Sequence, residues 1–141
     1  MKNDNKIQLF LVDDDALFLK LLEIDFLQHT NFTIKTFATG ELCMANLTHN
    51  PDIIILDYYL DSIDKNAMNG LKTLDKINSF NPDIPVVILS SQNKIDVAIN
   101  CIHHRAFDYL VKSQTDFLSL KKIITTIFHY KKMGKELIWS I

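Results

Sequence analysis

Short apolar runs alternate with segments of helical periodicity along this 141-residue chain, and the alternation constrains the fold more than any other feature. The runs predict strands over residues 7–12, 32–37, 52–56, 85–89 and 107–111. Most are nearly continuous in apolar residues, which is typical of strands buried on both faces of a sheet. The intervening segments predict helices over residues 16–27, 41–47, 70–80 and 95–104, and a last helix from about residue 116 to 132 or beyond.

Strands that alternate with helices predict an α/β domain, in which right-handed crossovers join parallel strands and helices cover both faces of the sheet. The composition, 48% hydrophobic and 23% charged, is that of a domain able to bury a core. We expect one domain over residues 6–133, and a helical extension or linker over residues 134–141. In helix 95–104 we expect Ile95, Ala98, Ile99 and Ile102 to face inward.

Charge and cysteine content argue against several classes of protein. The net charge of -2 does not suggest a nucleic-acid-binding protein, and the five lysines from Phe117 to Ile141 are expected to line a solvated helix face. Cys43 and Cys101 are expected to be reduced and to pack in the interior. Because there is no signal peptide, and no apolar run near the roughly 18 residues of a membrane span, we expect a cytoplasmic protein.

Polar side chains follow four of the five strands at the point where each strand ends, and in a parallel sheet these ends meet at one edge. The residues are Asp13, Asp14 and Asp15 after the first strand, Asp57 after the third, Ser90 after the fourth and Lys112 after the fifth. Crowded carboxylates repel one another unless a cation compensates them, and Mg²⁺ prefers such oxygen ligands. A lysine and a hydroxyl beside them complete a pocket for a tetrahedral oxyanion. Asp15 is better explained as the N-cap of the next helix.

With this pattern the chain resembles the receiver domains of bacterial two-component response regulators. Receivers carry an acidic pair after strand one, a phosphorylatable aspartate after strand three, a Thr or Ser after strand four and a Lys after strand five. Val12-Asp13-Asp14, Leu56-Asp57, Leu89-Ser90-Ser91 and Asp108-Tyr109-Leu110-Val111-Lys112 match this order. The resemblance covers residues 6–133 and implies a flavodoxin-like, doubly wound (βα)5 fold with a five-stranded parallel sheet.

The resemblance implies a Mg²⁺ site. Asp14 would be the main direct ligand of the acidic pair, and Asp13 would act mostly through a metal-bound water. Asp57 would be both a metal ligand and the phosphoacceptor, and the backbone carbonyl of Tyr59 would be the third protein ligand.

The resemblance also implies roles for three further residues. Ser90 would bind a phosphoryl oxygen, and Lys112 would pair with the phosphate, or with Asp57 in the unphosphorylated protein. Tyr109 matches the aromatic switch position, which is expected to move inward together with Ser90.

The implied function is a signalling switch that accepts a phosphoryl group from a histidine kinase or a phosphotransfer protein. Such a domain catalyses only its own phosphorylation and dephosphorylation, so it is not an enzyme in the usual sense. Its output would be a conformational change around the fourth helix, fifth strand and fifth helix, a surface that is also considered for a homodimer. No direct contact with nucleic acid or with a membrane is expected.

The sequence departs from the family in two places. Gly70 lies thirteen residues after Asp57, further than the usual glycine, and the usual loop proline is missing. We expect an enlarged loop that tunes partner choice or phosphate lifetime, or else a neutral insertion. Ser113 replaces the proline that normally follows the lysine. A cis bond before a residue other than proline costs about 3 kcal/mol, so we predict a trans Lys112–Ser113 bond.

Two other functions remain open on sequence alone. A receiver-shaped interaction module that is no longer phosphorylated would account for Ser113 and the long loop. A Mg²⁺-dependent phosphatase is the second, since Asp13-Asp14-Asp15-Ala16-Leu17 partly resembles the Asp-x-Asp-x-Thr motif of haloacid-dehalogenase hydrolases. That motif lacks its threonine here, and the length leaves no room for a substrate cap.

Near the C-terminus, Ile138, Trp139 and Ile141 are expected to need cover by packing.

Overall fold

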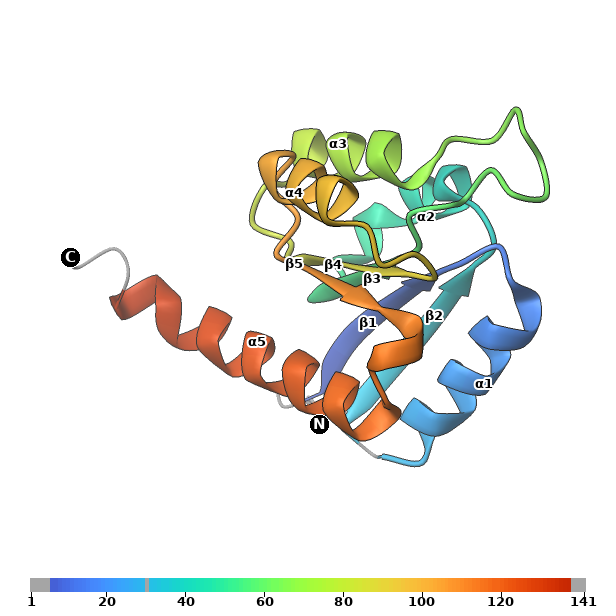
Figure 1. Ribbon diagram of the computed structural model, residues 1–141. Helices are drawn as coiled ribbons and strands as arrows, with labels where there is room; N and C mark the ends of the chain where they lie inside the picture. Colours follow the sequence, from blue (N-terminus) through green and yellow to red (C-terminus); the bar gives the residue numbers. More distant parts are fainter. Residues whose placement is uncertain (1–5, 30, 138–141) are drawn as a thin grey trace.

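The computed structural model describes residues 6–29 and 31–137 and contains one five-stranded sheet (Figure 1). Its strands are β1 (Ile7–Val12), β2 (Phe32–Phe37), β3 (Ile53–Leu56), β4 (Val86–Ser90) and β5 (Asp108–Val111). They lie in the order β2-β1-β3-β4-β5, and each neighbouring pair is parallel. The predicted parallel sheet is therefore confirmed, with strand ends within one residue of the expected positions.

Helices cover both faces of this sheet, as predicted. They are α1 (Ala16–Leu27), α2 (Gly40–Ala45), α3 (Gly70–Phe80), α4 (Ile95–His103) and α5 (Phe117–Leu137), with short 3-10 helices at Leu47–His49 and Lys112–Gln114. Figure 1 shows α1 and α5 on one face and α2, α3 and α4 on the other. The fold is a doubly wound, flavodoxin-like (βα)5 arrangement.

Two hydrophobic cores, one on each side of the sheet, explain why the strands are so apolar. Alternate strand residues such as Leu9 and Ile55 pack toward Phe26 of α1 and Ile124 of α5. The residues between them pack toward α2, α3 and α4. The edge strand β2 is less covered, since Phe32 is its one buried residue.

Local capping sets the starts of the helices. Asp15 is the N-cap of α1, as predicted, and its carboxylate accepts a hydrogen bond from the Phe18 amide at 3.1 Å. Thr39 and Asn69 cap α2 and α3 in the same way. Such caps satisfy amides that the helix leaves without partners, and they fix where the chain turns from strand end to helix.

The predicted inward face of α4 is wrong. Ile95, Ile99 and Ile102 are 78%, 52% and 47% exposed, and the buried residue of the helix is Cys101, with Val97 partly buried beside it. Both sides of α4 are apolar, so periodicity did not identify the packed side. Cys43 and Cys101 are free and buried, as expected.

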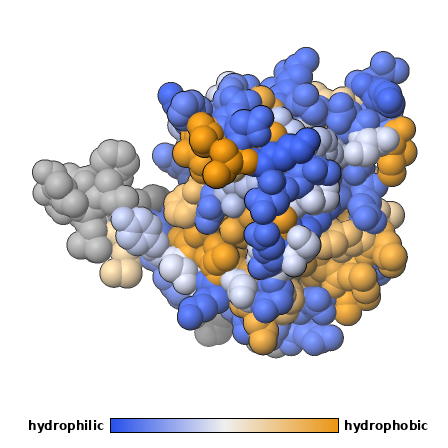
Figure 2. Space-filling model, viewed as in Figure 1, coloured by the Kyte–Doolittle hydropathy of each residue, from blue (hydrophilic) through white to orange (hydrophobic). Residues whose placement is uncertain are grey.

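Exposed hydrophobic side chains form groups on the surface. Figure 2 shows one group over α1 and another beside α4. The α1 group consists of Leu17, Leu21, Ile24 and Leu27, spaced along one side of the helix.

The C-terminal helix continues as far as Leu137, whereas Ile138, Trp139 and Ile141, predicted to need cover, lie outside the described residues. Within residues 6–29 and 31–137, no helix combines the length and the apolar character needed to span a bilayer.

Candidate functional site

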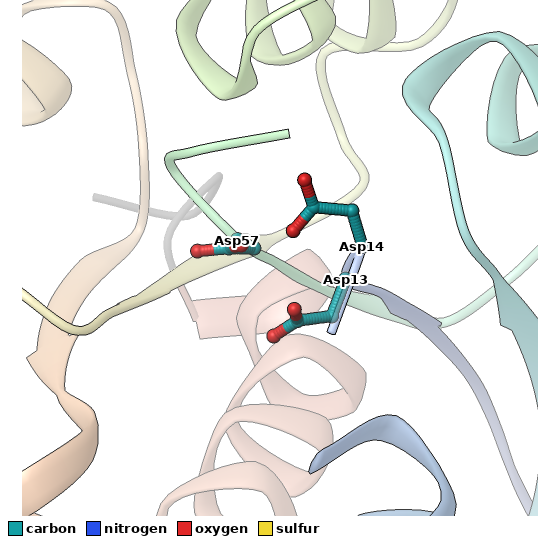
Figure 3. A group of neighbouring side chains, drawn as sticks. All are labelled: Asp13, Asp14 and Asp57. Carbon is teal, nitrogen blue, oxygen red and sulfur yellow. The ribbon is translucent and has the colours of Figure 1, made fainter. Parts of the chain in front are cut away.

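Three aspartates converge at the carboxyl edge of the sheet. Figure 3 shows Asp13 and Asp14 at the end of β1 beside Asp57 at the end of β3. These strands are neighbours, and the Asp57 amide donates to the Val12 carbonyl at 2.8 Å. Each aspartate offers one carboxylate oxygen to a set whose members all lie within 4.8 Å of one another. The structure thus brings together the side chains that the sequence assigned to one site.

Burial makes these carboxylates hard to ionise together. Asp13 and Asp57 are only 4% and 5% exposed, and Asp14 is half-buried. Burial raises the pKa of Asp57 to about 7, and repulsion from the Asp13 carboxylate adds to the rise, while Lys112 opposes it. Burial likewise raises the pKa of Asp13, against the influence of Lys112. The site holds more negative charge than its single lysine compensates.

This set of donors fits a hard divalent cation. Three carboxylates provide the oxygen ligands that Mg²⁺ prefers, and an excess of buried negative charge favours a cation over a neutral ligand. The Tyr59 carbonyl, the fourth predicted ligand, follows Asp57 by two residues, and the Tyr59 amide donates to Asp57 Oδ1 at 3.3 Å. The ligand roles of these four residues stay predictions.

Lys112 reaches the aspartates although serine follows it. Its Nζ lies 2.8 Å from Asp13 Oδ2 and 4.0 Å from Asp57 Oδ1, so its shorter ion pair is with Asp13. The ammonium group also lies 4.2 Å from the centroid of the Phe18 ring, a cation–π contact. The described residues contain no cis peptide bond, which confirms the predicted trans Lys112–Ser113 linkage.

Ser90 and Tyr109 are joined through Gln92, a residue for which no role was predicted. The Ser90 side chain is fully buried, and its Oγ accepts a hydrogen bond from the Gln92 amide at 3.1 Å. The Tyr109 hydroxyl donates to the Gln92 carbonyl at 2.7 Å. Both contacts use the main chain of Gln92, so its side-chain identity offered no signal. The switch role of Ser90 and Tyr109 stays a prediction.

The loop between β3 and α3 (residues 57–69) folds over the acidic cluster. The amides of Ser62 and Ile63 donate to Asp14 Oδ2 at 3.1 and 3.3 Å, and Ser62 Oγ donates to the Tyr59 carbonyl at 3.0 Å. Further along, the Met68 amide donates to Glu41 Oε2 at 2.9 Å. The enlarged loop was predicted, but its contacts with Asp14 and Glu41 were not.

Gly70 closes this loop at a point with no room for a side chain. Its amide donates to the Tyr58 carbonyl at 2.9 Å, and an added Cβ would overlap the main chain of Asp57 and Tyr58. The start of α3 therefore packs directly on the segment that carries Asp57.

Comparison with known proteins agrees with this geometry. The family model of the response regulator receiver domain matches residues 9–125. The transcriptional regulatory protein ZraR of Salmonella typhimurium is 26% identical over 133 residues, which are 94% of this chain and 29% of ZraR. A protein-glutamate methylesterase/protein-glutamine glutaminase of Clostridium acetobutylicum is 31% identical over 118 residues, 79% of this chain and 32% of that protein. The chain thus spans about a third or less of these relatives.

Solved structures show the same fold. A CheY-like response regulator receiver domain protein from Methanospirillum hungatei superimposes with a TM-score of 0.78 at 17% identity, covering 92% of this chain and 98% of the other. A complex of CheX and CheY with BeF3 and Mg²⁺ from Borrelia burgdorferi matches with a TM-score of 0.73 at 25% identity, covering 86% and 89%. Since the family model spans most of the chain, this protein belongs to the response regulator receiver domain family, the phosphorylation switches of two-component signalling.

Proposed function

We propose that this receiver domain accepts a phosphoryl group onto Asp57 from a histidine kinase or a phosphotransfer protein, with Mg²⁺ bound. The observation that carries the proposal is the position of Asp57. Its carboxylate is 5% exposed, shares an acidic cluster with Asp13 and Asp14, and has an ammonium group 4.0 Å away. A carboxylate held beside a cation site and a lysine is suited to attack phosphorus.

Asp14, Asp57 and the Tyr59 carbonyl would hold the ion directly, and Asp13 would hold it through a water. When bound, Mg²⁺ would neutralise charge on the phosphoryl oxygens. The Borrelia burgdorferi complex contains Mg²⁺ together with BeF3, which supports the same ion for this chain.

In the proposed reaction an Asp57 oxygen forms a bond to phosphorus while the bond from phosphorus to the donor histidine nitrogen breaks. The electron pair of that bond stays on the imidazole, and the product is an aspartyl phosphate. Lys112 would shift its contact from Asp13 toward a phosphoryl oxygen, and the Ser90 hydroxyl would donate to another. The chain carries out this step once on itself, so we do not propose that it is an enzyme in the usual sense.

The exposed face of α1 suits the docking of a protein phosphodonor. α1 begins directly after the acidic residues, and Leu17, Leu21 and Ile24 are 70%, 54% and 45% exposed along it. A donor histidine must approach Asp57 from this edge of the sheet, so a helical partner could bury these side chains as it delivers the phosphoryl group. We propose the α4–β5–α5 surface as the output face, because α4 exposes three isoleucines there.

The test is the intact mass of the protein after incubation with acetyl phosphate and Mg²⁺. We expect the wild type to gain about 80 Da in an acid-stable, base-labile form, as for one phosphoryl group on a carboxylate. Asp57→Asn, which preserves the size of the side chain but removes the nucleophilic carboxylate, should gain nothing.

An unlabelled wild type, with Mg²⁺ binding intact and hydrolysis too slow to hide an adduct, would contradict the proposal. That outcome would favour a receiver-shaped interaction module that is no longer phosphorylated. Equal labelling of Asp57→Asn would instead show that another residue accepts the phosphoryl group.

A further inference from the structure

Ser62 contacts two of the groups that we assign to the magnesium site. Its amide donates to Asp14 Oδ2 at 3.1 Å, and its hydroxyl donates to the Tyr59 carbonyl at 3.0 Å. The neighbouring Ile63 amide adds a second bond to the same Asp14 oxygen at 3.3 Å. One short segment of the β3–α3 loop therefore holds a carboxylate from the end of β1 and a carbonyl that follows β3.

These bonds leave both groups able to bind a cation. The two amides share Oδ2 of Asp14, and among the described residues no hydrogen bond reaches its Oδ1. The Tyr59 carbonyl accepts one bond from Ser62, and a carbonyl oxygen has two lone pairs. Ligands of metal ions are commonly oriented by hydrogen bonds of this kind from residues that do not touch the metal.

The position of Ser62 is fixed from both sides of the loop. Leu60, two residues earlier, is 1% exposed and belongs to the core under α2, α3 and α4. Later in the loop, the Met68 amide donates to Glu41 Oε2 on α2. Ser62 itself is exposed, so its contacts with Asp14 and Tyr59, rather than burial, define what it does.

We propose that Ser62 is a positioning residue for the metal site, holding the Asp14 carboxylate and the Tyr59 carbonyl in the orientation that Mg²⁺ requires. The inference rests on the proposed function, since it concerns the same ion. It gives the enlarged loop a role in setting metal affinity and predicts that the loop stays in place when Mg²⁺ binds.

The first test is the Mg²⁺ dissociation constant of the unphosphorylated protein, measured by titration calorimetry. Ser62→Ala removes the hydroxyl and should weaken binding about tenfold, the lower end of the effect of losing a group that orients a metal ligand. Ser62→Thr keeps a hydroxyl and should restore most of the affinity. Lys65→Ala, an exposed change in the same loop, serves as the control and should bind as the wild type does.

The second test follows the Ser62 and Ile63 amides by NMR hydrogen exchange with and without Mg²⁺. If Ser62 positions the ligands, both amides remain protected at saturating Mg²⁺. Loss of their protection, or tighter Mg²⁺ binding by Ser62→Ala, would mean that the loop competes with the ion and would overturn the inference. Equal affinity of Ser62→Ala and wild type would overturn it as well.

The two proposals fail in different ways. If the wild type binds no Mg²⁺, the proposed function loses its metal ion and the inference about Ser62 is wrong as well. A wild type that binds Mg²⁺ and is labelled on Asp57, with an unaffected Ser62→Ala variant, removes the inference alone. Unfolding of both variants without Mg²⁺ should match the wild type, which excludes a general loss of structure.

Discussion

Asp57 carries its charge at a cost to the folded state of the metal-free protein. Burial and the Asp13 carboxylate raise its pKa from 3.8 to about 7, so the folded protein favours the neutral carboxyl. A group whose pKa is higher in the folded state than in the unfolded state stabilises the folded protein fully at pH values below its unfolded pKa. This stabilisation is lost as the pH rises through its folded pKa. For Asp57 this stabilisation is lost between about pH 4 and about pH 7.

We therefore predict that the free energy of unfolding without metal falls between about pH 4 and about pH 7, by a few kcal/mol at most. Urea denaturation in the presence of a chelator measures it. Asp57→Asn cannot ionise at this position and should show a flatter pH dependence. Adding Mg²⁺ at about pH 8 should restore stability to the wild type, because an ion held by the three aspartates of the folded protein would bind the folded state only. A wild type that gains stability with rising pH would contradict this account.

At the residue scale, the sequence predicted which side chains meet but not every contact between them. Asp13, Asp14, Asp57 and Lys112 follow strands whose ends share one edge, so their convergence could be inferred from their order. The bonds from Ser62 and Gln92 depend on main-chain amides and carbonyls. Every residue offers such groups, so only the folded path of the loop decides where they lie.

At the element scale, the end of α4 has an unusual cap. The Arg105 amide donates to the Ile102 carbonyl at 2.9 Å and the Ala106 amide to the Cys101 carbonyl at 3.0 Å, the pattern of a Schellman motif. The motif places Arg105 at φ 70, in the left-handed region that favours glycine.

Arg105→Gly should consequently stabilise the protein by about 0.5–1 kcal/mol, since relief of the strain outweighs the conformational entropy that glycine adds to the unfolded chain. The matched control is Asn50→Gly. Asn50 also has a positive φ, of 56, but asparagine tolerates this conformation, so we expect a smaller gain. Thermal unfolding of the two variants at the same pH compares them directly. A destabilised Arg105→Gly variant would show that the arginine side chain makes a contribution larger than the strain.

The wrong prediction of the inward face of α4 also concerns a single element. Periodicity shows that a helix has an apolar side, but α4 has two, with Val97 and Cys101 on one and Ile95, Ile99 and Ile102 on the other. The choice between them depends on the sheet, which lies against Cys101 in space. Ile95, Ile99 and Ile102 therefore stay exposed and are available for contact with another protein surface.

At the scale of the whole molecule, we predict that phosphorylation brings two copies together through the α4–β5–α5 surface. Ile99 and Ile102 line a surface groove there with Asp108 and Tyr109. Sedimentation with acetyl phosphate and Mg²⁺ should show twice the monomer mass for the wild type and the monomer mass for Ile99→Lys. Leu17→Lys changes an even more exposed residue on α1 and should still dimerise. A fully labelled wild type that stays monomeric would contradict the prediction.

The fold as a whole was more predictable than its surfaces. Strands buried on both faces must be apolar at nearly every position, and these runs located β1, β3 and β4 to within a residue. Alternation with helices then fixed a parallel sheet. Surfaces such as the exposed side of α1 follow no comparable rule, because an apolar residue outside is compatible with the same fold.

The length of α5 has a mechanical consequence. Its buried residues, Leu120, Ile124, Ile127 and Phe128, hold its first part on the sheet, and Figure 1 shows the rest extending past the sheet. From Phe117 to Leu137 the axis is about 30 Å long at the usual rise per residue. Since its described buried residues end at Phe128, the part free to swing, from Phe128 to Leu137, is about 14 Å long. A tilt of about 10° at Phe128 would therefore move the far end by about 2 Å. A small repacking beneath Phe128 would thus be amplified at the end of the helix.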